Sequence, residues 1–223
     1  MPTTKPESAA RQDYLKAILR LAAGDRRVQT TELAHALGVQ KPSVTAMLQR
    51  LAEEGLVEYS PRRGVVLSPA GKRASLQVLR RHRLLETFLV EVLGLDWSEV
   101  HEEAEVLEHH LSDRIVDAID RALGHPAEDP HGHPIPDARG RLPVRHLAPL
   151  QGMTEGRRGV VREVRTNEPG RLQRWKELGL VPGAEVRMGE RQTLEDVMHL
   201  EVSGRPMVTG TEGVEGVFVE YLE

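Results

Sequence analysis

The stretch that decides the fold is Thr30–Leu51, which reads TTELAHALGVQKPSVTAMLQRL. With Thr30 counted as position 1, a small residue (Ala34) stands at position 5 and Gly38 stands at position 9. Apolar residues occupy positions 4, 8, 10, 15 and 18, and these are Leu33, Leu37, Val39, Val44 and Met47. The small residue lets two helices approach, the glycine permits a tight turn, and the apolar positions seat both helices on a core. The spacing therefore predicts a helix-turn-helix.

The residues around this stretch predict a winged form of the motif. A first helix shows one apolar face and is expected to stop at Gly24-Asp25. Thr31 is the predicted N-cap of a helix over 32–37, and a further helix is expected from Pro42 to Glu54. Two short strands, 56–59 and 65–67, are predicted to form a hairpin. The apolar face of the first helix consists of Tyr14, Leu15, Ile18, Leu19 and Ala22.

The charge distribution favours a polyanionic partner for this end of the chain. Residues 1–80 carry a net charge of +6, whereas the whole chain carries −4. The second helix of the motif is expected to enter a DNA major groove, and the hairpin arginines are expected to grip the backbone or the minor groove. The predicted DNA-contacting residues are Gln40, Lys41, Ser43, Thr45, Arg50, Arg62 and Arg63.

Three further regions follow the hairpin. Two long helices are expected over 69–93 and 99–123, the second with an apolar stripe of Ala104, Leu107, Leu111, Ile115 and Ile119. Residues 124–152 hold six of the 14 prolines and predict a linker or an extended surface segment. Short β-type runs over 159–164, 184–188, 197–202 and 214–221 predict a small β-barrel.

Histidines and carboxylates recur at helical spacing in the two long helices. His101, Glu105, Glu108 and His109 share one face of the second helix, and His82 and Glu86 are four residues apart on the first. Asp13, at the edge of the apolar face of the first helix, can point inward to the same place. Burying these carboxylates without a cation is costly, so the pattern predicts a metal site. By contrast, His110, and His125, His131 and His133 in the proline-rich segment, are expected to be exposed.

Composition narrows the chemistry. The chain has no cysteine, which excludes disulfides, thiolate metal sites and cysteine nucleophiles, and it fits a reducing, cytoplasmic setting. No apolar run is long enough to span a membrane, and residues 1–11 hold no signal peptide. Carboxylates with imidazole suit Mn²⁺ or Fe²⁺. A metalloenzyme and a regulator that senses an organic ligand are the alternatives, although nucleophile motifs and phosphate loops are missing and aromatic residues are few.

At this point the chain resembles the diphtheria toxin repressor and manganese transport regulator family of metal-dependent repressors. The resemblance rests on Asp13-Tyr14-Leu15, the helix-turn-helix, RRHRLLE at 80–86, GLDWSEVHEEAEVLEHHLSD at 94–113, HGHPIP at 131–136 and LGLVPGAEV at 178–186. It implies an α+β chain with a winged helix-turn-helix (1–72), an all-α metal-binding and dimerisation domain (73–124), a linker (125–150) and an SH3-like domain (151–223). It also implies a homodimer that binds a palindromic double-stranded DNA operator.

The resemblance implies two metal sites. The primary site maps onto Asp13, Glu105, Glu108 and His109, and the ancillary site onto His82, Glu86, His101 and Glu168. The iron-sensing branch has Met and Cys where this chain has Asp13 and Glu105, so Mn²⁺ is expected first and Fe²⁺ second. Two residues depart from the pattern. Lys16 stands where the manganese branch has a glutamate, which argues against a closely spaced metal pair. Arg171 stands where a glutamine ligand is expected, and it cannot bind a metal.

Overall fold

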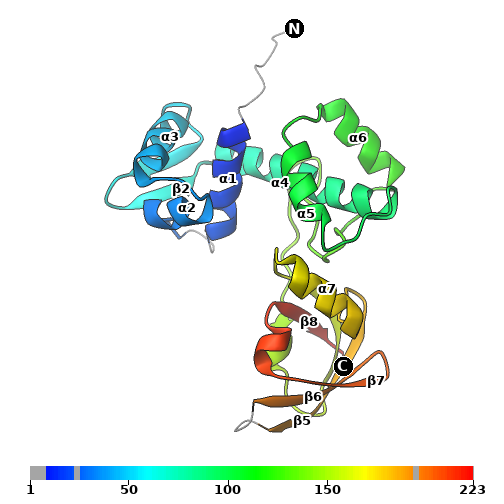
Figure 1. Ribbon diagram of the computed structural model, residues 1–223. Helices are drawn as coiled ribbons and strands as arrows, with labels where there is room; N and C mark the ends of the chain where they lie inside the picture. Colours follow the sequence, from blue (N-terminus) through cyan, green and yellow to red (C-terminus); the bar gives the residue numbers. More distant parts are fainter. Residues whose placement is uncertain (1–8, 23–25, 193–195, 223) are drawn as a thin grey trace. The chain divides into compact units, whose positions relative to one another are not determined.

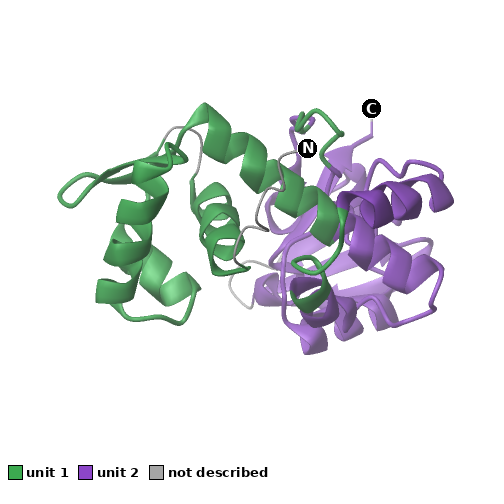
Figure 2. Cartoon of the chain, turned by 90° about the horizontal axis from the view of Figure 1, so that it is seen from above, with its two compact units in different colours: residues 1–82, 106–112, 136–142 green, residues 83–105, 113–135, 143–223 purple. Residues whose placement is uncertain are grey.

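The computed structural model describes residues 9–22, 26–192 and 196–222 (Figure 1). The chain divides into two compact units (Figure 2). Unit 1 comprises residues 1–82, 106–112 and 136–142, and unit 2 comprises 83–105, 113–135 and 143–223. The long helix α4 (Pro69–Glu91) runs from one unit into the other. None of the helices in the described ranges combines the length and the apolar composition that a membrane span needs.

Unit 1 contains the predicted winged helix-turn-helix. Its elements are α1 (Ala9–Leu21), α2 (Thr30–Ala36), α3 (Lys41–Glu53), β1 (Val57–Ser60) and β2 (Gly64–Leu67). Gly38, in the turn between α2 and α3, has φ +63°, a conformation that glycine adopts without strain. The wing is an antiparallel hairpin, and Val28 adds a bridge to Val65 on its outer side. The helix-turn-helix and its wing are therefore confirmed.

The core of unit 1 joins α1 to the DNA-reading motif. The fully buried Leu15 and Ile18 of α1 pack in one cluster with Leu33 of α2, Val44 of α3 and Val65 of the wing. A displacement of α1 would therefore be transmitted to the whole helix-turn-helix, because close-packed interiors transmit displacement. Two details differ from expectation. Gln29, not Thr31, caps α2, because Gln29 and Glu32 form a reciprocal capping box. The predicted stop at Gly24-Asp25 lies outside the described residues.

The second long helix is not continuous. The expected helix over 99–123 is two helices, α5 (Val100–Leu107) and α6 (Asp113–Ala122), separated by a turn. Glu108 and His109 lie in that turn and bond to side chains of α1 and α4 in unit 1. These side-chain bonds hold the turn in place of a continuous helix. The next helix, α6, begins at Asp113, an acidic residue that is favourable in the first turn of a helix. The predicted apolar stripe is broken as well, since Ile115 is 48% exposed.

Unit 2 holds the β-rich end of the chain. Its six strands pair antiparallel in the order β3-β8-β4-β5-β6-β7, and the helix α7 (Pro169–Leu178) buries Leu172 and Trp175 in the core of this part. The four predicted β-type runs correspond to β4, β5, β6 and β8, whereas β3, β7 and α7 were not predicted. The strands are β3 (Ala148–Pro149), β4 (Arg158–Val164), β5 (Glu185–Gln192), β6 (Val197–Val202), β7 (Arg205–Thr209) and β8 (Val217–Tyr221), with short 3₁₀ turns at Leu150–Gly152 and Thr211–Val214.

The proline-rich segment is not a surface linker throughout. Residues 129–135 are largely buried within unit 2, and Asp129 accepts backbone N–H bonds from His131 and His133. Gly132 makes this turn possible, because its φ is +84° and a Cβ there would meet the carbonyl oxygen of Arg162 at 1.9 Å. The expectation of an exposed segment is therefore wrong for 129–135, where side-chain bonds and packing replace solvent.

An ion pair in unit 2 supports a first prediction. Lys176 of α7 donates to Asp96 at 2.5 Å, and this bond, with those from Ser98, lowers the Asp96 pKa from 3.8 to about 2. A depressed folded-state pKa stabilises the fold above the unfolded pKa, and this contribution disappears as the pH falls from about 4 to 2. Asp96→Asn should therefore lower the thermal midpoint by about 2 to 4 °C at neutral pH. In melting curves across pH, the gap between wild type and variant should close near pH 2; a constant gap would contradict the assignment.

Candidate metal centre and DNA-binding surface

The predicted DNA-contacting residues form an accessible set in unit 1. Gln40, Lys41 and Ser43 are exposed at the start of α3, Thr45 is half-buried, and Arg50 is exposed further along the helix. Arg62 and Arg63 are exposed at the tip of the wing. Within the described residues, Lys41, Arg50, Arg62 and Arg63 have no ion-pair partner, so their charges are available to phosphate groups.

Three of the predicted primary metal ligands come together in unit 1. Asp13 of α1 and Glu108 and His109 of the turn after α5 each offer one ligand atom, and these atoms lie within 4.8 Å of one another. His109 Nε2 is 2.9 Å from Asp13 Oδ1 and 3.5 Å from Glu108 Oε1. Two carboxylates and an imidazole from separate segments therefore converge, and this donor set fits Mn²⁺ or Fe²⁺.

The orientation of His109 strengthens this assignment. Its Nδ1 lies 2.7 Å from the amide oxygen of Gln12, a buried residue of α1. That oxygen can only accept, so Nδ1 donates a proton to it, and Nε2 is left facing the two carboxylate oxygens. With a proton on Nε2 these groups form an ion pair; without it, the same three atoms can bind a metal ion. A ligand histidine held by a second hydrogen bond is the usual arrangement around protein-bound metals.

Glu108 is the most buried member of the cluster. Its side chain is 0% exposed, and both of its oxygens are bonded. Lys16 Nζ donates to Oε1 at 2.5 Å, and His82 Nδ1 lies 2.7 Å from Oε2. His82, a predicted ancillary ligand, therefore contacts the primary-site carboxylate in this structure.

Glu105, the remaining predicted primary ligand, is not in the group that the structure brings together. It lies one turn before His109, and its Oε1 is 3.5 Å from His101 Nε2 in unit 2. The same histidine bonds to Glu86 of α4, with 3.0 Å between His101 Nδ1 and Glu86 Oε1. Glu86 and His101 are thus in place as predicted ancillary ligands, and His82 precedes Glu86 by one turn of α4.

Glu168 lies apart from these ligands in the described structure. Its side chain is 74% exposed at the N-cap of α7, and Glu168 pairs with Arg171 at 3.5 Å. Arg171 also donates to the carbonyl oxygen of Glu215. An ion pair between groups this exposed contributes little stability, because water screens both charges.

The histidines expected to be exposed divide into two kinds. His110 is exposed, and the side chain of His125 is 69% exposed beside Asp120. The expectation was wrong for the others: His131 is 4% exposed and His133 is half-buried.

His131 and His133 form a third potential ligand group with Asp129, within 4.8 Å. His131 stacks on Trp97, and its Nε2 donates to the Trp97 carbonyl oxygen at 2.9 Å. The other ring nitrogen of His131, Nδ1, lies 3.9 Å from Glu86 Oε2. The buried Glu163 of β4 lies 3.7 Å from His133 Nε2.

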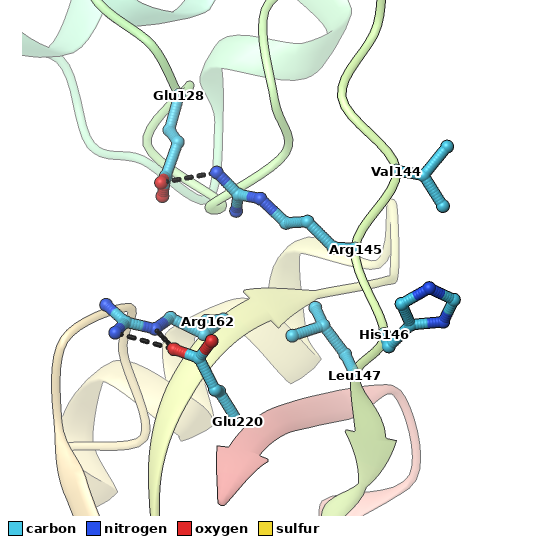
Figure 3. Close-up of a pocket in the computed structure, with 7 residues that line it drawn as sticks. All are labelled: Glu128, Val144, Arg145, His146, Leu147, Arg162 and Glu220. Atoms are coloured by element: carbon cyan, nitrogen blue, oxygen red, sulfur yellow. Dashed lines mark hydrogen bonds and ion pairs between the residues drawn. The ribbon is translucent and has the colours of Figure 1, made fainter.

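Unit 2 also contains an open polar pocket of about 500 Å³ (Figure 3). Its four charged side chains neutralise one another, because Arg145 pairs with Glu128 and Arg162 pairs with Glu220. The seven lining residues include none of the predicted metal ligands. The pocket and the metal ligands are therefore separate features.

The sequence matches three domain families in order. Residues 8–65 match the N-terminal DNA-binding domain of iron-dependent repressors, 68–137 match their metal-binding and dimerisation domain, and 148–221 match the FeoA domain. The iron-dependent repressor IdeR of Mycobacterium tuberculosis H37Rv is 32% identical over 185 residues, which are 78% of this chain and 80% of the relative.

The chain belongs to the iron-dependent repressor family.

Solved structures agree with this membership. A manganese-dependent transcriptional repressor in complex with manganese superposes with a TM-score of 0.85 at 37% identity, covering 95% of this chain and all of the other. The manganese regulator SloR superposes with a TM-score of 0.73 at 30% identity, covering 98% of this chain and all of the other.

This repressor is a metal-dependent DNA-binding regulator of iron or manganese homeostasis. The α+β architecture is confirmed: a helix-turn-helix domain, a helical dimerisation domain and a β-rich FeoA (SH3-like) domain. The metalloenzyme alternative is wrong, because the chain belongs to a family of transcriptional repressors. The organic-ligand alternative is wrong for the same reason, since the middle domain of this family binds metal.

Four residues that lie in or beside the potential ligand groups were not predicted from the sequence as part of them. Gln12 carries no motif, and only the bond to His109 reveals it. Asp129, His131 and His133 stand at alternate positions in a proline-rich segment, and this composition suggested a linker. The D-x-H-x-H spacing was the signal that could have found them, because three potential ligands so close in sequence can share one turn.

Proposed function

We propose that the protein is a homodimeric repressor that binds a palindromic operator when Mn²⁺, or as second choice Fe²⁺, occupies the primary site. The proposed ligands are Asp13, Glu108 and His109, with Glu105 one turn earlier. The observation that carries the proposal is the His109 imidazole, fixed by Gln12 so that its Nε2 faces two carboxylates.

The ligands connect the DNA-reading motif to the helical domain. Asp13 lies on α1, whose buried residues pack into the core of the helix-turn-helix. Glu108 and His109 directly follow α5 in the chain. A bound divalent ion supplies the positive charge that ties these segments together. Fixing α1 in this way restricts the recognition helices, which in a two-fold dimer must reach major grooves about 34 Å apart. Metal and DNA affinities are then coupled reciprocally.

The dimer assignment is supported by exposed apolar residues in the helical part of unit 2. Val92 and Leu93, just past the end of α4, are 53% and 55% exposed, and Ile115 of α6 is 48% exposed. Covering such side chains is one contribution that a dimer interface would make to stability. The proposed domain boundaries are 1–72, 73–124, 125–150 and 151–223, with the buried part of the third segment packing within unit 2.

The ancillary site is proposed at His82, Glu86 and His101. The Glu86–His101 bond supports it, and His131, whose Nδ1 faces Glu86 Oε2, is a further ligand available to it. Glu168, whose carboxylate is exposed and paired with Arg171, is not in the ligand group that supports this site. We rank Mn²⁺ before Fe²⁺ because this chain has Asp13 and Glu105 where the iron-sensing branch of the family has Met and Cys.

The proposed function is tested by DNA binding of the chelator-stripped protein to its own upstream region. The protein is titrated with Mn²⁺, and with Fe²⁺ under anaerobic conditions, at fixed salt. Operator affinity should rise about 5- to 150-fold with the activating ion, which is the usual range of allosteric coupling. Arg62→Ala should weaken binding at every metal concentration and reduce the salt slope by about 1. Equal affinity with and without metal would contradict the proposal.

A further inference from the structure

The primary cluster already contains a cation. Lys16 lies one turn after Asp13 on α1, is 5% exposed, and donates to Glu108 Oε1 at 2.5 Å. Lysine is seldom so buried, and an ammonium removed from water needs a close counter-charge. Glu108, fully buried, provides it.

Lys16 binds the oxygen that a metal would use. Of the two Glu108 oxygens, Oε1 is the one 3.5 Å from His109 Nε2, whereas Oε2 is bonded to His82. The ammonium therefore holds the Glu108 carboxylate in its ligand position in the metal-free protein. It also places a positive charge next to the point where the divalent ion enters, and like charges at this separation repel strongly in a buried setting.

We propose that Lys16 is a resident cation of the primary metal site, which preorganises Glu108 and lowers the affinity of the site for its divalent ion. The proposal rests on the proposed function, since it takes Asp13, Glu108 and His109 as the metal ligands. Lys16 thereby sets the metal concentration at which the repressor responds: without its charge the site fills at a lower concentration.

The test compares Lys16→Gln, Lys16→Arg and the control Lys176→Gln in the full chain. Lys176 makes the same kind of lysine–carboxylate bond, to Asp96, and neither residue is a predicted ligand. Calorimetric titration with Mn²⁺ measures affinity, and melting curves in chelator measure the stability of the metal-free protein. Lys16→Gln should melt at a lower temperature in chelator yet bind Mn²⁺ at least about tenfold more tightly. Lys16→Arg and Lys176→Gln should bind Mn²⁺ within about threefold of wild type, because both leave the charge at the site in place.

The outcomes separate the two proposals. If wild type binds Mn²⁺ and Lys16→Gln binds it equally or more weakly, the role of Lys16 is overturned and the proposed function stands. If wild type binds no Mn²⁺ and no Fe²⁺, the proposed function itself fails. A Lys16→Gln protein that is unfolded in chelator but folds with Mn²⁺ supports the proposal, because the ion then replaces the ammonium. If it stays unfolded in saturating Mn²⁺ while Lys16→Arg folds, the ion cannot replace the ammonium and the proposal is overturned.

Discussion

Glu108→Ala is expected to destabilise the metal-free protein by about 3 to 5 kcal/mol, because removing one partner of a buried ion pair leaves the other charge uncompensated. Lys16 and His82 both bond to this carboxylate inside unit 1, where neither can turn readily to water. Urea unfolding in the presence of chelator measures the free energy change. The same substitution should also abolish Mn²⁺ binding at the primary site, since a ligand is lost.

Glu103→Ala is the matched control. Glu103 is an exposed carboxylate of α5, five residues before Glu108, and its removal should change the free energy of unfolding by no more than about 0.5 kcal/mol. If the two variants unfold at the same urea concentration, the Lys16–Glu108–His82 network does not stabilise the fold as described.

Asp13→Ala is expected to remove metal-activated operator binding while the protein stays folded and dimeric. The Asp13 side chain is 37% exposed, so its loss costs little folding free energy, but it is a direct ligand in the proposed site. Loss of residues that only orient ligands typically weakens metal binding 10- to 100-fold, and loss of a ligand should cost at least about 100-fold. Fluorescence anisotropy with labelled operator at increasing Mn²⁺ measures the effect.

Two observations decide how Asp13→Ala is interpreted. Glu177→Ala, which removes an exposed carboxylate of α7, should retain full Mn²⁺ activation. Light scattering reports the oligomeric state of the Asp13 variant. A monomeric variant would mean that α1 serves assembly, and unchanged activation by Mn²⁺ would remove Asp13 from the metal site.

The local patterns predicted the DNA-reading part well. Gly38, Ala34 and the apolar positions of Thr30–Leu51 are constraints within one short segment, so the motif is visible without tertiary information. The spacing of Glu108 and His109 likewise placed them on one cluster with Asp13, because helical periodicity and a resemblance both pointed there. The proposed metal ligands are thus largely those that the sequence suggested.

Tertiary contacts explain where sequence reasoning failed. The pattern of 99–123 is helical throughout, but the bonds of Glu108 and His109 to Lys16, His82 and Gln12 hold residues 108–112 in a turn. From the sequence, Lys16 was interpreted only as a residue that argues against a closely spaced metal pair. Its bond to Glu108 joins positions 92 residues apart, and no local pattern carries such information.

We propose that a metal ion held by Asp13, Glu108 and His109 activates this repressor. The most direct test is an anomalous difference map from crystals grown with Mn²⁺, with data collected on both sides of the manganese absorption edge. We expect a peak beside His109 Nε2, Asp13 Oδ1 and Glu108 Oε1, and we expect this peak to disappear in Asp13→Ala. Manganese found only beside Glu86 and His101, with the Asp13 cluster bridged by protein hydrogen bonds alone, would contradict the proposal.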